Sequence, residues 1–278
     1  MTKQLIGLSI VFLLLLGRGL HADDSVGPYI GTLTTTEAHL LYRPGNEAAT
    51  LRLTVHDEHC TKVTSVDRRS ESEQDFVAKF HVVGLDPGTT YRYQIEKIEA
   101  GSATLVAGAD GDFHFTTVPA DRSGQVLNVA FISCVNDSTD PVWQQMANHN
   151  LDLLCLGGDT PYADTGNLAD LRNKHRHLLQ RPRLAALGKS VPLVGTWDDH
   201  DFGLNNGNGK SAAALKENTR RAFVEYRVQD QYGSGEEGIY QKTDRGAIEV
   251  FLLDARWYSQ TGPSPVSPNQ STCYGKEQ

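Results

Sequence analysis

The sharpest constraint on the fold is a change of hydrophobic pattern near residue 120. Before it, apolar and polar side chains alternate, as in Leu-Arg-Leu-Thr-Val at residues 51–55 and again in residues 91–96. Residues 76–85 and 112–117 follow a similar pattern. A repeat of two is typical of strands that bury only one face. Residues 23–118 are therefore predicted to form a small β-sandwich domain.

Turn chemistry supports this prediction. Arg-Pro-Gly-Asn at residues 43–46 and Asp-Pro-Gly-Thr at 86–89 each join a proline, which presets one backbone dihedral, to a glycine, which accepts a positive φ. The longer run Gly-Leu-Asp-Pro-Gly-Thr-Thr-Tyr-Arg-Tyr at residues 84–93 resembles the corner of fibronectin type III-like domains. We therefore expect a fibronectin type III-like sandwich.

Residues 119–125 form a polar stretch with Pro and Gly that we interpret as a linker, and the pattern changes after it. Continuous apolar runs replace the alternation, and amphipathic stretches separate them. Such runs are typical of a buried sheet covered by helices. Residues 126–278 are therefore predicted to form an α/β domain. Its expected strands are 126–133, 151–156, 191–196 and 247–253, and its expected helices are 140–148, 167–180 and 212–226.

The first 22 residues have the pattern of a signal peptide. Lys3 precedes an almost unbroken apolar run at residues 5–17, Arg18 ends the run, and Leu-His-Ala at residues 20–22 offers a cleavage site. The alternative is a retained membrane anchor, but the run is shorter than the ~20 apolar residues of a spanning helix. We expect an exported protein, either periplasmic or extracellular or associated with the cell envelope. No stable membrane insertion is expected after cleavage.

Charge and cysteine usage narrow the function further. A net charge of -8 argues against binding nucleic acid other than as a substrate. An acidic protein can still act on phosphates when metal ions offset its charge. Export permits disulfides, and the four cysteines allow three full pairings that the sequence does not distinguish. Cys155 lies inside an apolar run and is expected to be a buried thiol.

Polar loops follow four of the predicted α/β strands, at residues 133–137, 157–162, 196–201 and 253–256. Active sites of open α/β sheets form where the carboxyl ends of strands converge. Carboxylates suit hard cations, and thiol, phenol and imidazole groups suit iron or zinc. Alone, a Gly-Gly-Asp turn is usually only a turn, and Asp-Asp-His-Asp is often a solvated loop. Their occurrence at successive strand ends favours a metal site.

Asp159 is the central candidate because its two oxygens can bridge two ions, while the glycines before it allow a close backbone approach. Asp198, Asp199 and Asp201, with Asp164 further away, would repel one another unless cations or protons balanced their charge. Two ions ~3.5–4 Å apart can hold the attacking and leaving oxygens of a phosphoryl transfer. The pattern therefore indicates metal-assisted chemistry on phosphate.

Four motifs stand in order along the chain: Ser133-Cys134, Gly158-Asp159 with Tyr162, Trp197-Asp198-Asp199-His200 with Asn205, and Leu253-Asp254-Ala255-Arg256. Their joint order resembles the PhoD-like (alkaline phosphatase D) metallophosphatase family over almost the whole mature chain. The resemblance implies a secreted phosphoesterase for phosphomonoesters, phosphodiesters or both, in which a metal-activated hydroxide attacks phosphorus. A sandwich in front of the catalytic domain matches the family's usual arrangement.

The resemblance also implies a two-metal site. Cys134, Asp159 and Tyr162 would bind Fe3+, and Asp159 would bridge to a second ion, Ca2+. Asp199 and Asn205 would complete the Ca2+ ligands, with Mn or Zn as alternative metals.

Two further residues would act on the substrate. His200 would donate a proton to the leaving oxygen or stabilise it, and Arg256 would contact phosphate oxygens. Asp198, Asp201 and Asn136 are expected to lie behind the ligands and support them.

The family's downstream Gly-Asp-Ile-His-type motif does not occur before Gln278, so we expect the α/β domain to lack its C-terminal part. Two other functions remain open. One is a non-catalytic fragment or degenerate binding protein with a fibronectin-like module. The other is a phospholipase-D-like hydrolase that uses the same metal site on lipid head groups. A Ser-His-Asp hydrolase is disfavoured because no Gly-x-Ser-x-Gly elbow follows a strand.

Three other polar features are interpreted as surface structure. His-Asp-Glu-His-Cys at residues 56–60 is expected to be a polar loop, and His-Arg-His at 175–177 a solvated helix face. A basic group is also expected to be a solvated helix face and comprises Lys216, Arg220, Arg221 and Arg227.

Overall fold

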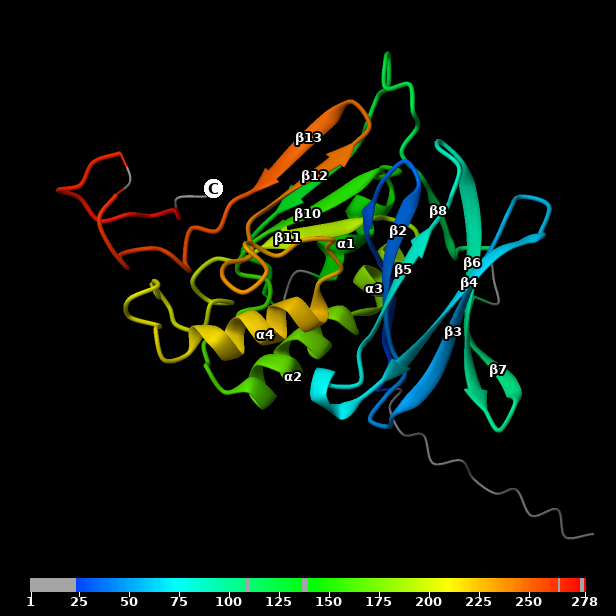
Figure 1. Ribbon diagram of the computed structural model, residues 1–278, viewed down its shortest axis with the longest axis horizontal. Coiled ribbons are helices and arrows are strands. Elements are labelled where there is room, and N and C mark those ends of the chain that lie inside the picture. Colours follow the sequence, from blue (N-terminus) through cyan, green and yellow to red (C-terminus); the bar gives the residue numbers. More distant parts are fainter. Residues whose placement is uncertain (1–23, 109–110, 137–139, 265, 276–277) are drawn as a thin grey trace, which may run out of the picture.

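The computed structural model describes residues 24–108, 111–136, 140–264, 266–275 and 278. The predicted signal peptide, residues 1–22, lies outside this part of the chain. No helix in the described part is both long and apolar enough to cross a membrane. Figure 1 shows antiparallel strands on one side of the molecule, and a second sheet with helices beside them.

The antiparallel strands form the predicted sandwich. Its strands are β1 (Val26–Leu33), β2 (Glu37–Arg43), β3 (Ala49–His56), β4 (Lys62–Ser70), β5 (Ala78–Val83), β6 (Thr90–Glu99), β7 (Ser102–Ala107) and β8 (His114–Thr116), with a 3-10 turn, η1 (Ser72–Gln74), before β5. One sheet has the order β1-β2-β5, and the other has the order β4-β3-β6-β7 with β8 paired to β6.

The alternating pattern produces the core of this sandwich. Leu51, Leu53 and Val55 of β3 and Tyr93 of β6 point into one hydrophobic cluster between the sheets, as predicted. Fully burying one such side chain stabilises the fold by about 1.5–3 kcal/mol. At the predicted corner, the hydroxyl of Tyr91 accepts a hydrogen bond from the backbone N–H of residue 86 at 2.8 Å.

The second part contains a parallel sheet and four helices. Strands β9 (Val129–Ile132), β10 (Leu153–Gly157) and β11 (Leu193–Thr196) are parallel in the order β11-β10-β9. The helices are α1 (Asp140–Ala147), α2 (Leu168–Leu179), α3 (Pro182–Gly188) and α4 (Lys216–Tyr226), and a hairpin joins β12 (Gln241–Arg245) to β13 (Ile248–Leu252). Helices α2 and α4 run side by side below the sheet in Figure 1.

Two details differ from the sequence expectation. The sheet is not buried on both faces: along β9, Val129 is 40% and Phe131 66% exposed, and Phe251 of β13 is 62% exposed. The β12-β13 hairpin covers only part of the apolar face that β9 shares: Val250 and Leu252 cluster with Leu153, Cys155 and Val194, and the β9 side chains stay exposed. The predicted strand at 247–253 forms, but it pairs antiparallel with β12, a strand that the sequence analysis did not predict.

The sandwich and the α/β part share a second hydrophobic cluster, in which Tyr29 and Leu41 meet Leu154 and Leu184. The hydroxyl of Tyr29 donates to the carbonyl of residue 179 at 2.6 Å. The backbone N–H of Thr32 donates to the carbonyl of residue 228 at 3.0 Å. One side of the β1-β2-β5 sheet is therefore packed against the α/β part.

Candidate metal centre

The three parallel strands end at one edge of the sheet, and their following loops meet there. The backbone N–H of Cys134 donates to the carbonyl of Gly158 at 3.1 Å, and Val135 N–H donates to the carbonyl of Asp159 at 3.1 Å. These bonds tie the loop after β9 to the loop after β10. They bring the Cys134 Sγ to 3.5 Å from Asp159 Oδ2.

The backbone at this edge adopts uncommon conformations. Cys134, Asp159 and Asp164 have φ of 56°, 52° and 50°, in the left-handed region that non-glycine residues rarely occupy. Gly158 has φ of +104°, and a Cβ placed on it would lie 2.6 Å from both the Cβ and the backbone N of Asp198. Only glycine fits where the loops after β10 and β11 approach so closely. Such conformations cluster at functional sites.

Asp159, Asp199 and His200 form the centre of the site. One potential ligand atom from each lies within 4.8 Å of the others. Asp159 and Asp199 are 6% and 8% exposed, and the backbone N–H of His200 donates to Asp159 Oδ1 at 3.3 Å. Carboxylates and an imidazole gathered at this depth suit a cation, because the two negative charges otherwise repel each other.

His200 is held by Asp164, whose Oδ1 lies 2.7 Å from the imidazole Nδ1. Burial alone would lower the pKa of His200, but the hydrogen bond and charge of Asp164 raise it above its usual value. The ring of Tyr162 lies 4.3 Å from the His200 ring, centroid to centroid. The carboxylate and the phenol ring therefore fix the orientation of the imidazole.

The pKa values of Tyr162 and Asp199 are shifted in opposite directions. Burial, followed by hydrogen bonding to Cys134 and the charge of Asp159, raises the pKa of Tyr162 to about 12. Burial on its own would raise the pKa of Asp199, but the backbone N–H of Asn206 and the charge of Arg256 hold it below its usual value. Asp199 is thus a carboxylate at neutral pH, whereas the Tyr162 phenol keeps its proton unless a cation displaces it.

Arg256 reaches the acidic loop from the segment after β13. Its Nε donates to Asp198 Oδ1 at 2.5 Å, and its Nη1 donates to the carbonyl of Gly207 at 3.0 Å. Its Nη2 lies 3.5 Å from Asp199 Oδ1. The guanidinium is 24% exposed, so a charged donor lines the edge of the site beside the two aspartates.

Asp201 lies beneath the loop rather than in its opening. It is 2% exposed and accepts backbone hydrogen bonds from Asp198 at 2.5 Å and from Thr160 at 3.3 Å. Burial raises its pKa to about 7, although these N–H groups and the charge of Arg227 act in the opposite direction. Asp201 therefore braces the loops after β10 and β11, as a residue behind the ligands would.

The two asparagines named from the sequence are both exposed. Asn205 Oδ1 accepts a hydrogen bond from Asn206 Nδ2 at 3.2 Å, and the carbonyl of Asn136 accepts one from Arg181 Nη1 at 3.0 Å. Their roles at the site stay predictions.

Sequence reasoning missed the anchoring residues of the site. Asp164 was recognised only as a distant acid, yet its two-residue separation from Tyr162 was the available signal. Asp254 accepts hydrogen bonds from Trp197 Nε1 at 2.7 Å and from the backbone N–H of Trp257 at 2.9 Å, which joins the segment of Arg256 to the acidic loop. Trp197 and Asp254 both stand in the motifs quoted from the sequence, but no local pattern indicated that they contact each other.

Two of the surface interpretations were wrong. His175 is 1% exposed because its face of α2 packs against α4, where its ring stacks on Tyr226 at 5.6 Å. Arg227 is fully buried just after α4, and its Nη2 donates to the carbonyl of Thr160. Arg220 is also not simply solvated, since it donates to three backbone carbonyls.

The cysteines and the polar loop are consistent with their interpretations. Cys155 is 1% exposed, and burial raises the pKa of its thiol to about 11. All four cysteines are free thiols. In residues 56–60, Asp57 Oδ1 accepts from the backbone N–H groups of His59 and Thr61 at 2.9 and 2.8 Å, as in a polar turn.

The donor set fits a pair of metal ions. The thiol of Cys134 and the phenol of Tyr162 are both within hydrogen-bonding reach of the Asp159 carboxylate, and Asp199 and His200 each have a ligand atom within 4.8 Å of it. The first group is suited to iron, and carboxylate oxygens are suited to a hard divalent cation.

The model of the PhoD-like phosphatase family matches residues 129–278. The alkaline phosphatase D of Bacillus subtilis (strain 168) is 27% identical over 269 residues, which cover 80% of this chain and 44% of that protein. A solved structure of PhoD superposes with a TM-score of 0.71 at 20% identity, over 90% of this chain and 57% of that one.

The chain thus spans less than half the length of the curated relative and little more than half of the solved structure. The superposition shows a shared fold for nearly all of this chain. The family match covers every strand end that contributes to the candidate centre, from β9 to the segment of Arg256. On this match, the chain belongs to the PhoD-like phosphatase family.

Proposed function

We propose that this chain forms part of an exported, metal-dependent phosphoesterase that hydrolyses phosphomonoesters, phosphodiesters or both. The observation that carries the proposal is the convergence of Cys134, Asp159, Asp199 and His200 at one edge of the parallel sheet. Membership of the PhoD-like phosphatase family supports phosphate esters as the substrate class.

The proposed centre holds Fe3+ through Cys134, Asp159 and Tyr162, and Ca2+ through Asp159, Asp199 and Asn205, with Mn or Zn as alternative metals. When bound, the ions would lower the pKa of a water and offset charge on the phosphate oxygens. The short approach of Sγ to the Asp159 carboxylate supports the iron half, and the low pKa of Asp199 supports the calcium half.

His200 and Arg256 are the groups proposed to act on the substrate. Asp164 fixes the His200 imidazole through Nδ1 and favours its protonated form, so a proton is available for the leaving oxygen. Asp198 and Gly207 hold Arg256 at the edge of the site, where its remaining N–H groups can pair with phosphate oxygens.

The wider organisation is part of the proposal. We propose a fibronectin type III-like domain at residues 23–118, a linker at 119–125, and an α/β metallophosphatase layer from residue 126 onward. The signal-peptide pattern at residues 1–22 supports export to the periplasm, the extracellular space or the cell envelope.

The test compares the wild-type chain with Asp159→Asn. Metal content is measured by elemental mass spectrometry, and kcat/KM is measured on p-nitrophenyl phosphate and bis(p-nitrophenyl) phosphate. We expect Asp159→Asn to lose iron and calcium and to lower kcat/KM by at least about 100-fold, because the ions supply several kcal/mol of stabilisation. Asp170→Asn, which changes an exposed carboxylate of α2, should retain both.

Other outcomes identify the alternatives. Hydrolysis of phosphatidylcholine vesicles without hydrolysis of the aryl phosphates would indicate a phospholipase-D-like enzyme. Metal that depends on Asp159 but supports no hydrolysis would indicate a non-catalytic binding protein. Equal metal content in Asp159→Asn and the wild type would contradict the proposed centre.

A further inference from the structure

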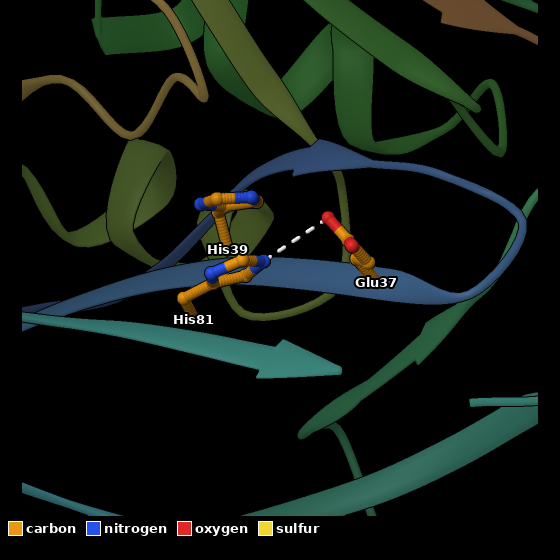
Figure 2. A group of neighbouring side chains, drawn as sticks. All are labelled: Glu37, His39 and His81. Atoms are coloured by element: carbon orange, nitrogen blue, oxygen red, sulfur yellow. Dashed lines mark hydrogen bonds and ion pairs between the residues drawn. The ribbon is translucent and has the colours of Figure 1, made fainter. Parts of the chain in front are cut away.

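A second group of ligand-type side chains lies on the sandwich, far along the chain from the candidate metal centre. Glu37 and His39 are two residues apart on β2, so they point to the same face of the sheet. His81 on β5 stands directly opposite His39 in the antiparallel register. Figure 2 shows the three side chains projecting together from these neighbouring strands.

These side chains project away from the core of the sandwich. Their neighbours Ala38, Leu40, Phe80 and Val82 point the other way, into the cluster between the two sheets. The strand register, and not a flexible loop, therefore sets the position of the group. A site built on paired strands is held more rigidly than one on a loop.

The three groups are close enough to share one ion. One ligand atom from each lies within 4.8 Å of the others, and His81 Nε2 lies 3.0 Å from Glu37 Oε2. The His39 and His81 rings stack with centroids 4.3 Å apart and an angle of 16° between their planes. Ligands about 2.0–2.1 Å from a tetrahedral zinc ion lie roughly 3.3 Å apart, so zinc binding requires the three side chains to turn inward from their positions here.

The α/β part contributes a carboxylate, that of Asp230, to the surroundings of the three side chains. Asp230 receives a hydrogen bond from Thr32 Oγ1 at 3.2 Å, on the strand next to β2, and its charge reaches His39. Lys79 is turned to the hydroxyl of Tyr232, at 3.0 Å. Burial, and next the neighbouring His81, lower the pKa of His39.

We propose that Glu37, His39 and His81 form a second metal site, for a zinc-class divalent cation, separate from the phosphatase centre. Two imidazoles and one carboxylate are a ligand set that zinc uses, with the fourth position taken by water or by a nearby carboxylate such as Asp230. The ion would join β2 to the edge strand β5 beside the α/β part. Its role is structural: the three ligands are brought together only when β2 and β5 are paired, so an ion bound there stabilises the folded state relative to the unfolded chain.

The test uses the full chain, stripped of metal and titrated with Zn2+ alone. Bound zinc is counted by isothermal titration calorimetry, and the thermal midpoint is followed with and without Zn2+. His81→Gln removes one ligand whose side chain is 44% exposed, and Glu37→Gln removes another that is 39% exposed, so neither change disturbs the core. The control is His59→Gln, because His59 pairs with Glu58 at 3.4 Å in solvent and belongs to neither ligand group found among the described residues.

We expect the wild type and His59→Gln to bind one zinc ion more than His81→Gln and Glu37→Gln, or to bind it at least about tenfold more tightly. The zinc-dependent rise in thermal midpoint should shrink in the same two variants. Asp159→Asn, which alters only the phosphatase centre, should keep this ion. Equal zinc stoichiometry, affinity and midpoint shift in the wild type and His81→Gln would overturn the proposal, even if the phosphatase centre behaves as proposed.

Discussion

Replacing Gly158 by Ala tests the close approach of the loops that build the candidate centre. The added Cβ would lie 2.6 Å from both the Cβ and the backbone N of Asp198, and φ of +104° is unfavourable for any residue with a side chain. The backbone strain costs about 1–2 kcal/mol, and overpacking costs about 1–3 kcal/mol more. We therefore expect the free energy of unfolding to fall by roughly 2–5 kcal/mol.

Two other glycines of the α/β part separate these contributions. Gly235 has φ of +98° with open space around it, so Gly235→Ala should cost only the backbone strain, about 1–2 kcal/mol. Gly262 has neither a positive φ nor a close neighbour, so Gly262→Ala should be neutral or stabilise by up to about 1 kcal/mol through the unfolded state. The contact with Asp198 is measured by the difference between the first two variants.

The assay is urea unfolding followed by tryptophan fluorescence. All three tryptophans lie beyond residue 126, and Trp197 and Trp257 pack in the cluster next to the acidic loop. The transition therefore reports on the α/β part. A loss of stability in Gly158→Ala no larger than that in Gly235→Ala would refute the close approach, and with it the geometry of the site.

Three further changes test individual contacts. His175 is buried, and burial holds its pKa well below the usual value of 6.5. Below pH 6.5 the unfolded state therefore takes up a proton that the folded state does not take up. The free energy of unfolding should fall by up to about 1.4 kcal/mol for each unit by which the pH is lowered below that value. His175→Phe should flatten this slope in urea titrations, and His149→Gln, an exposed control, should not. Tyr91→Phe should lower the calorimetric unfolding free energy by about 1–3 kcal/mol, because it leaves a backbone N–H without its acceptor; no loss would contradict the corner. Asp164→Asn should move the NMR titration of His200 in the metal-free chain to lower pH, and an unchanged midpoint would argue against their pairing.

The fold was predictable from the sequence where local pattern and burial coincide. Residues 51–55 alternate because β3 buries one face, and the apolar run at 151–156 is continuous because β10 lies in the middle of the parallel sheet. Helix α2 (Leu168–Leu179) lies within the predicted range 167–180, and it begins where Asn167 Oδ1 accepts from the backbone N–H groups of residues 169 and 170. Short-range forces decide each of these features.

Part of the candidate site was predictable for a topological reason. Parallel strands end at one edge, so residues just after them, such as Cys134, Asp159 and Asp199, are brought together whatever the details of packing. The structure places these three residues at that edge. Their roles as metal ligands, like those of Tyr162 and Asn205, stay predictions.

Burial of single polar side chains was decided only by the tertiary structure. His175 and Arg227 lie in segments whose other polar residues suggested solvent, but the packing of α2 against α4 and the buried loop of Thr160 enclose them. Helical spacing defines a face without specifying what covers it. The expected burial of β9 failed for the same reason, since a continuous apolar run does not say whether a second layer is present.

By itself, the sequence determined the division into an alternating β part and an α/β part, together with the order of the loops that carry the candidate centre. These properties are encoded within a few neighbouring residues. The tertiary structure alone decided that Arg256 meets Asp198 and that His39 faces His81, because both contacts join segments far apart in the chain. Strand register and packing between elements set such contacts, and neither leaves a local pattern in the sequence.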